Sequence, residues 1–196
     1  MEKDWKGTEE SPFKIIGASN HCDYDREPLD FYATDPDVLE PLLKKEKFAH
    51  SIWEPACGLG HLSQRLKDHG FNVKETDIVN RVGNDTLDFL KYDGQKFIGD
   101  IITNPPYSKA KEFVEKSLEV IPDGYKVAMF LKLTFLEGKD RRKLFDKYPP
   151  RKVMVFSERQ KCAMNGDFDK LKGSAIAYAW VIWQKGYKGP TVLEWI

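Results

Sequence analysis

Residues 101–107 read IITNPPY, an apolar run that ends in Asn104, Pro105, Pro106 and Tyr107. The amide oxygen of an asparagine and a backbone carbonyl accept hydrogen bonds, and a tyrosine ring can stack on a flat group. Two prolines fix φ and make the segment rigid. A turn is the ordinary interpretation. The sharper hypothesis is that this segment holds something planar and polar.

A second candidate is EPACGLG, residues 54–60, between a predicted strand and a predicted helix. Gly58 and Gly60 allow a tight turn and a close approach of the backbone to a ligand. Glu54, just before the turn, suits a ligand with an ammonium group better than a pyrophosphate. A plain strand–helix turn explains the same residues about as well.

Acidic residues follow at two further places. Asp77 ends a predicted strand, where an acid can hold ribose hydroxyls, and Ile78 would then cover one face of a base. Asp88 and Phe89 could accept from an adenine amino group and flank its ring. The alternatives are a surface aspartate at position 77, and a helix start at position 88 with Phe89 in the core.

These residues need elements that position them. Strands are predicted at 51–56, 71–78, 96–103, 125–136, 152–157 and 174–185, and helices at 60–70, 108–121 and 139–148. Thr34 or Asp35 can cap an earlier helix, with Pro36 at its first position. The alternation predicts an α/β fold with a mostly parallel sheet and one antiparallel strand at its edge region. The candidate residues then share the carboxyl edge.

Composition sets the class of protein. The chain has 196 residues, 41% hydrophobic and 32% charged, with net charge zero, and reads as a soluble globular protein. We expect a flexible segment over 1–30 and a single domain over 31–196. The three cysteines lie far apart, without metal or disulfide spacing, and no signal peptide or membrane span is apparent. A cytoplasmic location is expected.

The glycine turn, the two acids and the NPPY segment occur in this order at successive strand ends. Together they resemble the S-adenosylmethionine-dependent DNA adenine N6-methyltransferases, in particular the small enzymes of phages and prophages. The resemblance runs from about Phe31 to the C-terminus, with FYATDP (31–36) as the N-terminal cofactor motif. It implies a Rossmann-like class I methyltransferase fold with a seven-stranded sheet and helices on both faces. It implies no separate target-recognition domain.

The resemblance also implies roles for individual residues. Asn104 and the Pro105 carbonyl would accept from the target amine, Pro106 would stiffen the loop, and Tyr107 would stack on the extruded base. The cofactor is S-adenosyl-L-methionine, and no metal is required. The residues expected to bind the cofactor are Tyr32, Thr34, Glu54, Pro55, Ala56, Cys57, Gly58, Gly60, Asp77, Ile78, Asp88, Phe89 and Asn104.

Basic residues are concentrated in the second half. Residues 101–196 carry a net charge of +7, which balances −7 in residues 1–100. This asymmetry is typical of a nucleic-acid face or of an ordinary solvated surface. The residues expected to contact nucleic acid are Lys139, Arg141 and Arg142 in the helix 139–148, and Arg159, Lys161, Phe168, Lys170 and Lys172 in the polar loop 158–174.

Several functions share this pattern. An RNA adenine N6-methyltransferase would keep the same site, and a protein glutamine N5-methyltransferase also acts on a planar nitrogen. Cytosine N4 methylation is disfavoured, because Ser or Asp would then be expected before the prolines. A non-catalytic binding module of the same fold is a further alternative. DNA is the expected partner. Either recognition is short and built from loops, or a second copy or another subunit helps.

Overall fold

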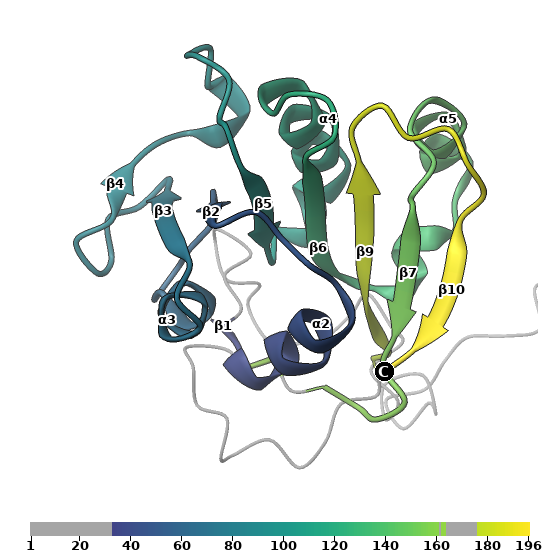
Figure 1. Cartoon of the computed structure of the whole chain (residues 1–196), viewed down its shortest axis with the longest axis horizontal. Coiled ribbons are helices and arrows are strands. Elements are labelled where there is room, and N and C mark those ends of the chain that lie inside the picture. Colours follow the sequence, from purple (N-terminus) through teal and green to yellow (C-terminus); the bar gives the residue numbers. More distant parts are fainter. Residues whose placement is uncertain (1–32, 161, 164–175) are drawn as a thin grey trace, which may run out of the picture.

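The computed structural model describes residues 33–160, 162–163 and 176–196. Its centre is an eight-stranded sheet in the order β10-β7-β9-β6-β5-β2-β3-β4 (Figure 1). The strands are β2 (Ser51–Glu54), β3 (Asn72–Asp77), β4 (Asp85–Thr86), β5 (Asp100–Thr103), β6 (Lys126–Lys132), β7 (Lys152–Val155), β9 (Tyr178–Gln184) and β10 (Val192–Trp195).

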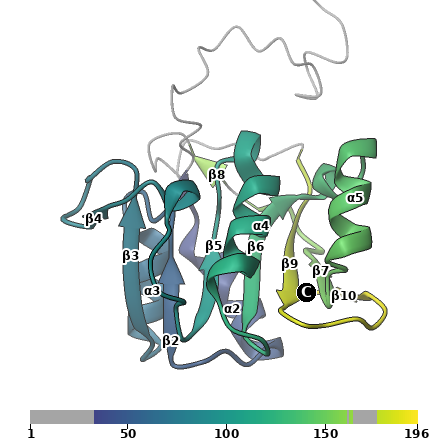
Figure 2. The same ribbon diagram turned by 90° about the horizontal axis from the view of Figure 1, so that it is seen from above.

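One strand of this sheet runs against the others. β9 is antiparallel to both β6 and β7, whereas the other pairings are parallel (Figure 2). The predicted α/β fold with one antiparallel strand is therefore confirmed. The sheet has one strand more than the seven expected, because the chain after β9 returns and adds β10 beside β7. β9 thus lies inside the sheet, and β10 forms its edge.

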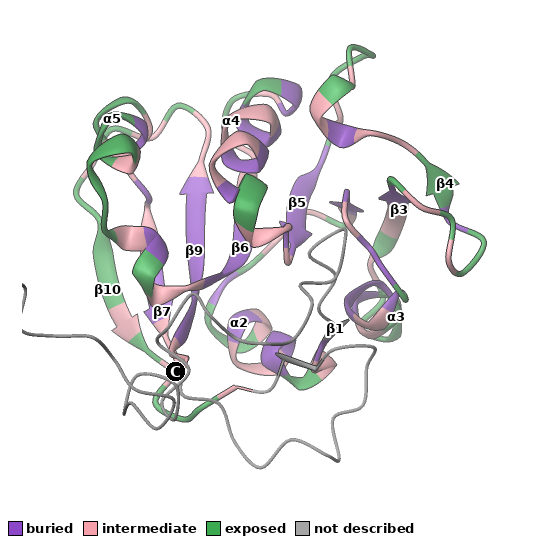
Figure 3. Ribbon diagram, turned by 180° about the vertical axis from the view of Figure 1, so that it is seen from behind, coloured by how far each residue is buried: buried purple, intermediate pink, exposed green. Residues whose placement is uncertain are grey.

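Helices cover both faces of the sheet (Figures 1 and 3). Alternate strand residues point to opposite faces, so Ile101 and Ile102 enter two different core clusters. Ile102 packs in the cluster of α2 (Leu39–Lys45) and α3 (His61–Asp68). Ile101 packs in the cluster of α4 (Ala110–Val120) and α5 (Lys139–Lys147). Burial on both faces explains why the central strand β6 carries a continuous apolar run over residues 127–131.

Short elements connect the main ones. Asp35 caps a 3-10 helix, Pro36–Val38, by accepting a hydrogen bond from the Asp37 amide at 3.0 Å. Further 3-10 helices span Phe89–Lys91, Tyr107–Lys109 and Leu133–Leu136. The last one ends β6 at Lys132, earlier than predicted. A separate two-stranded antiparallel sheet joins β1 (Ala33–Thr34) to β8 (Cys162–Ala163), with Thr34 opposite Cys162.

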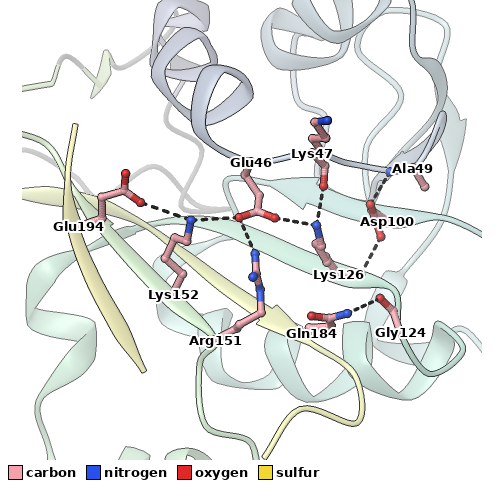
Figure 4. A network of polar contacts seen from close by, with 10 residues as sticks. All are labelled: Glu46, Lys47, Ala49, Asp100, Gly124, Lys126, Arg151, Lys152, Gln184 and Glu194. Carbon is pink, nitrogen blue, oxygen red and sulfur yellow. Dashed lines mark hydrogen bonds and ion pairs between the residues drawn. The ribbon is translucent and has the colours of Figure 1, made fainter. Parts of the chain in front are cut away.

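A network of ion pairs stabilises the edge of the sheet at which the parallel strands begin (Figure 4). Glu46, which is 7% exposed, pairs with Lys126 at 2.6 Å, Arg151 at 2.5 Å and Lys152 at 3.3 Å. Burial alone would raise the pKa of Glu46, but the hydrogen bond and charge of Lys126 and the neighbouring cations bring it below its ordinary value. The network joins α2 to β6 and β7.

Asp100 belongs to the same edge. Its carboxylate accepts from the amides of Ala49 and Lys126, each at 2.6 Å. Asp100 begins β5 and therefore lies at the edge opposite the carboxyl ends of the strands. Within the described part of the chain, no helix is long and apolar enough to cross a membrane.

Candidate active site

The candidate residues follow β2, β3 and β5, three strands that are parallel neighbours in the sheet. Their carboxyl ends therefore meet at one edge, where ligands bind in open α/β sheets. A hollow of about 140 Å³ lies at the opposite edge, lined in part by Tyr148, Trp183 and Tyr187. It is smaller than the ~300–1,000 Å³ typical of ligand pockets, so the carboxyl edge is the better candidate.

Asn104 follows directly after β5, and its side chain is held from one side. Its Nδ2 donates to Thr34 Oγ1 at 2.6 Å, a contact between residues 70 positions apart. Its Oδ1 is buried and has no hydrogen-bond partner among the described residues. An unpaired buried acceptor costs roughly 1–3 kcal/mol, so an acceptor left in this state is suited to a donor that arrives with a ligand.

The two prolines lead into a short helix. Pro105 is buried, and the Pro106 carbonyl accepts from the Lys109 amide at 2.9 Å to begin the 3-10 helix Tyr107–Lys109. This places the half-buried Tyr107 next to the ends of β6 and β9. The centre of its ring lies 6.3 Å from that of Tyr178 and 4.4 Å from Lys132 Nζ.

Sequence reasoning did not single out Lys132 and Tyr178. Both stand in predicted strands, and they are paired in register between β6 and β9. The available signal was that the predicted strand 125–136 runs toward the same edge as the NPPY segment. What the sequence did not show was the position of β9 between β6 and β7, which brings the start of β9 beside the end of β6.

The glycine turn has the backbone that was expected. Gly58 and Gly60 have φ values of 56° and 75°, a left-handed region that favours glycine, and Gly60 caps α3. The Gly58 amide donates to Asp77 Oδ2 at 2.9 Å, and the Cys57 amide donates to the Thr76 carbonyl at 3.1 Å. The turn is therefore tied to the end of β3. Pro55 is buried and Ala56 half-buried beside it.

Glu54 lies beneath this turn with only 2% of its surface exposed. Ser63, in the first turn of α3, donates its hydroxyl to Glu54 Oε2. Burial, together with the charges of Glu75 and Asp77, raises the pKa of Glu54 to about 8. The carboxyl is therefore mostly protonated at neutral pH, and a cationic ligand group would favour its ionised form.

Cys57 is buried next to these acids. Burial and the nearby charge of Glu54 raise the pKa of its thiol to about 12. A thiol in this state is not a nucleophile at neutral pH. No group of side chains suited to a metal ion occurs in the described ranges.

Asp77 is 7% exposed, and both of its oxygens are engaged. Besides the Gly58 contact, its Oδ1 accepts from the Val79 amide and from Arg81 Nη1, each at 3.0 Å. A carboxylate has about four lone-pair sites, so capacity for one more donor remains. Ile78, the next residue, is 54% exposed. Arg81 was not foreseen from the sequence.

Asp88 and Phe89 match the ordinary alternative. Asp88 caps the 3-10 helix by accepting from Leu90 at 3.2 Å, and its pair with Lys91 at 2.9 Å lowers its pKa. Phe89 is 2% exposed, with its ring 5.1 Å from that of Trp53. The ring therefore supports the core, and we no longer assign it to an adenine face.

The basic residues on α5 have different surroundings. The Arg141 guanidinium donates to the carbonyls of Glu137 at 2.8 Å and Thr134 at 3.0 Å. These bonds hold α5 to the segment that follows β6. Arg142 pairs with Asp146 at 2.8 Å on the surface. Lys139 and Arg159 are exposed. Tyr32, Lys161, Phe168, Lys170 and Lys172 lie outside the described residues.

Comparisons with known proteins identify the fold. No protein-family model matches the sequence, and no curated protein matches it. A proposed class I S-adenosylmethionine-dependent methyltransferase from Listeria monocytogenes has a TM-score of 0.58 at 12% identity, over 94% of this chain and 69% of that one. An O-methyltransferase of Thermotoga maritima has a TM-score of 0.52 at 12% identity, over 79% and 66%.

The M protein of the type I restriction enzyme EcoKI is also similar, with a TM-score of 0.53 at 15% identity. The match covers 81% of this chain but 44% of the EcoKI protein. The chain therefore has the fold of the class I S-adenosylmethionine-dependent methyltransferases. At these identities the likeness shows the fold alone, and the function has to be argued from the site.

Proposed function

We propose that this protein transfers a methyl group from S-adenosylmethionine to the N6 amino group of adenine in DNA. The observation that carries the proposal is the unpaired, buried Oδ1 of Asn104, directly before two prolines and a tyrosine. An exocyclic amine presents N–H donors, and this oxygen is an acceptor to which no described residue donates. The fold and the resemblance of the NPPY segment both support the same reading.

The residues at the carboxyl edge fit the cofactor. Gly58 and Gly60 form a tight turn with left-handed φ values, Ile78 exposes an apolar surface, and Asp77 would provide a carboxylate for ribose hydroxyls. Glu54 would interact with the ammonium group after losing its proton. When bound, S-adenosylmethionine supplies a methyl group on a sulfonium, which departs as a neutral thioether.

The protein's own contribution is orientation and charge placement. The lone pair of an adenine amine is delocalised into the ring, which makes the nitrogen a poor nucleophile. Acceptance of its two hydrogens by Asn104 Oδ1 and the Pro105 carbonyl would turn the lone pair toward the methyl carbon. A nitrogen–carbon bond would form as the carbon–sulfur bond breaks, and one amine hydrogen would leave as a proton to water.

Tyr107 would stack on the extruded base and offset part of the unstacking energy. The exposed cations Lys139, Arg142 and Arg159 would contact phosphates. Such contacts position the strand without reading its sequence. Lys161, Phe168, Lys170 and Lys172 remain part of this proposal from the sequence alone.

The test is methyl transfer from labelled S-adenosylmethionine to duplex DNA, single-stranded DNA, RNA and a protein extract, followed by digestion and mass analysis. N6-methyladenine in DNA is the expected product. Label in RNA or on glutamine would keep the site and replace the substrate. Cofactor binding without transfer to any of these would favour a non-catalytic binding module.

Asn104→Ala tests the role of this side chain. It should retain cofactor binding and lose about 100-fold or more in turnover, the order seen when one preorganised polar group is removed. Full activity in this variant would contradict the assigned role of Asn104.

A further inference from the structure

The orientation of the Asn104 amide needs an explanation. An amide rotated by 180° about its last bond would point Nδ2 at the target and could not accept from an amine. In the structure, Nδ2 faces Thr34 Oγ1 at 2.6 Å and Oδ1 is left for the target. Thr34 is therefore the residue that contacts the Asn104 amide in the productive orientation.

A hydroxyl alone does not fix this choice, since it both donates and accepts. Thr34 is 4% exposed, and its hydroxyl donates to no acceptor among the described residues. If a ligand takes the Thr34 proton, the hydroxyl can serve Asn104 only as an acceptor. Nδ2 must then face Thr34, and Oδ1 must face the target.

The position of Thr34 is set by its neighbours in the chain. Its backbone pairs with Cys162 across the small β1–β8 sheet, and Asp35 caps the helix that follows. Trp180 Nε1 donates to the Val38 carbonyl at 2.8 Å, which fastens that helix to β9. The hydroxyl is thus presented from a segment that is anchored on both sides.

We propose that Thr34 is a positioning residue that donates its proton to the carboxylate of the cofactor's methionine end and thereby fixes Asn104 with Oδ1 toward the target amine. This inference rests on the proposed function. It makes cofactor binding and target binding mutually favourable, because the bound carboxylate removes the unproductive orientation of the amide. By linkage, the gain is the same in either order of binding.

The first test needs no nucleic acid. The side-chain amide signals of Asn104 in ¹⁵N NMR spectra are assigned by their loss in Asn104→Ala. S-adenosylhomocysteine, which carries the same carboxylate, is then titrated into the wild type, Thr34→Ser and Thr34→Val. The Asn104 signals should shift in the wild type and in Thr34→Ser, which keeps the hydroxyl. They should stay in place in Thr34→Val, while the backbone signals of Gly58 and Gly60 still report binding.

The second test measures the coupling. Affinity for an adenine-containing duplex is compared with and without saturating S-adenosylhomocysteine. An increase of about 5-fold or more is expected in the wild type and in Thr34→Ser, and a ratio near one in Thr34→Val. Thr34→Ala is the second variant should Thr34→Val unfold, and thermal unfolding checks each protein.

The outcomes separate the two proposals. A Thr34→Val protein whose Asn104 signals shift like those of the wild type, or which keeps the coupling, overturns the role of Thr34 and leaves the proposed function intact. Methyl transfer to RNA or protein overturns the DNA assignment, while the NMR test still decides the role of Thr34. A wild type that does not bind S-adenosylhomocysteine overturns both.

Discussion

The ammonium group of Lys132 lies 4.4 Å from the centre of the Tyr107 ring, at the point where β6 ends beside the NPPY segment. A cation over an aromatic face is attracted by the ring and helps to hold it. The same charge stands next to the ring that would stack on a target base. Lys132 could therefore act in two ways: it could hold the Tyr107 ring in place, and it could attract a phosphate of the bound DNA.

Lys132→Met should weaken binding to DNA and reduce its salt dependence, because one cation near the backbone is removed. The slope of log affinity against log salt should fall by about 1. Affinity for S-adenosylhomocysteine should not change. Fluorescence anisotropy at several salt concentrations measures the slope. Lys188→Met, at the exposed opposite edge of the sheet, is the control, and an equal loss in that variant would argue against a local effect.

Asp77 and Arg81 should give effects of opposite sign on cofactor affinity. Asp77→Ala removes a charged acceptor and the tie to Gly58, so S-adenosylhomocysteine should bind about 10-fold or more weakly. Arg81→Gln releases Asp77 Oδ1 from a competing donor at 3.0 Å and should bind a few-fold more tightly. Calorimetry measures both. An Asp77→Ala protein with unchanged affinity would remove Asp77 from the cofactor site.

Glu54 should make the protein less stable as the pH rises from about 5 to 8. Its pKa is raised in the folded protein, so the folded state holds more protons than the unfolded state in this window. Stability then falls with pH by up to about 1.4 kcal/mol per unit. Glu54→Gln cannot ionise at this position, so its stability should not decline in this way. The excess of its free energy of unfolding over that of the wild type should be largest at pH 8.

Urea unfolding at pH 5, 6.5 and 8 provides the measurement for Glu54. The exposed Glu158→Gln is the matched control and should follow the wild type at each pH. If the stability of Glu54→Gln declines as steeply as that of the wild type, another group is responsible for the pH dependence.

Local pattern was sufficient to predict most of the fold. The predicted strands 51–56, 125–136 and 152–157 lie close to β2, β6 and β7, because both faces of the sheet are buried there and the central residues of these strands are apolar. β10 escaped prediction, since its four residues are largely exposed and carry no burial pattern. Its place is decided by pairing with β7, which only the tertiary structure shows.

The candidate site was predictable in its order along the chain and not in its contacts. Residue types at strand ends indicate that Asn104 and Asp77 meet at one edge, because parallel strands impose it. The bond between Thr34 and Asn104 joins distant parts of the sequence, and no local spacing encodes it. Phe89 shows a second limit. A phenylalanine after an aspartate gives the same sequence pattern whether its ring lies in a binding site or in the core.

Cofactor binding should release a proton from Glu54. The carboxyl is mostly protonated below its pKa of about 8, and an ammonium group nearby favours the ionised form. Affinity for S-adenosylhomocysteine should therefore rise with pH between about 5.5 and 7.5, by up to tenfold per unit. Calorimetry in buffers of different ionisation enthalpy measures the release directly. Glu54→Gln should bind S-adenosylhomocysteine without releasing a proton, and its affinity should change little over this pH range. Proton release that persists in this variant would assign the titration to another group.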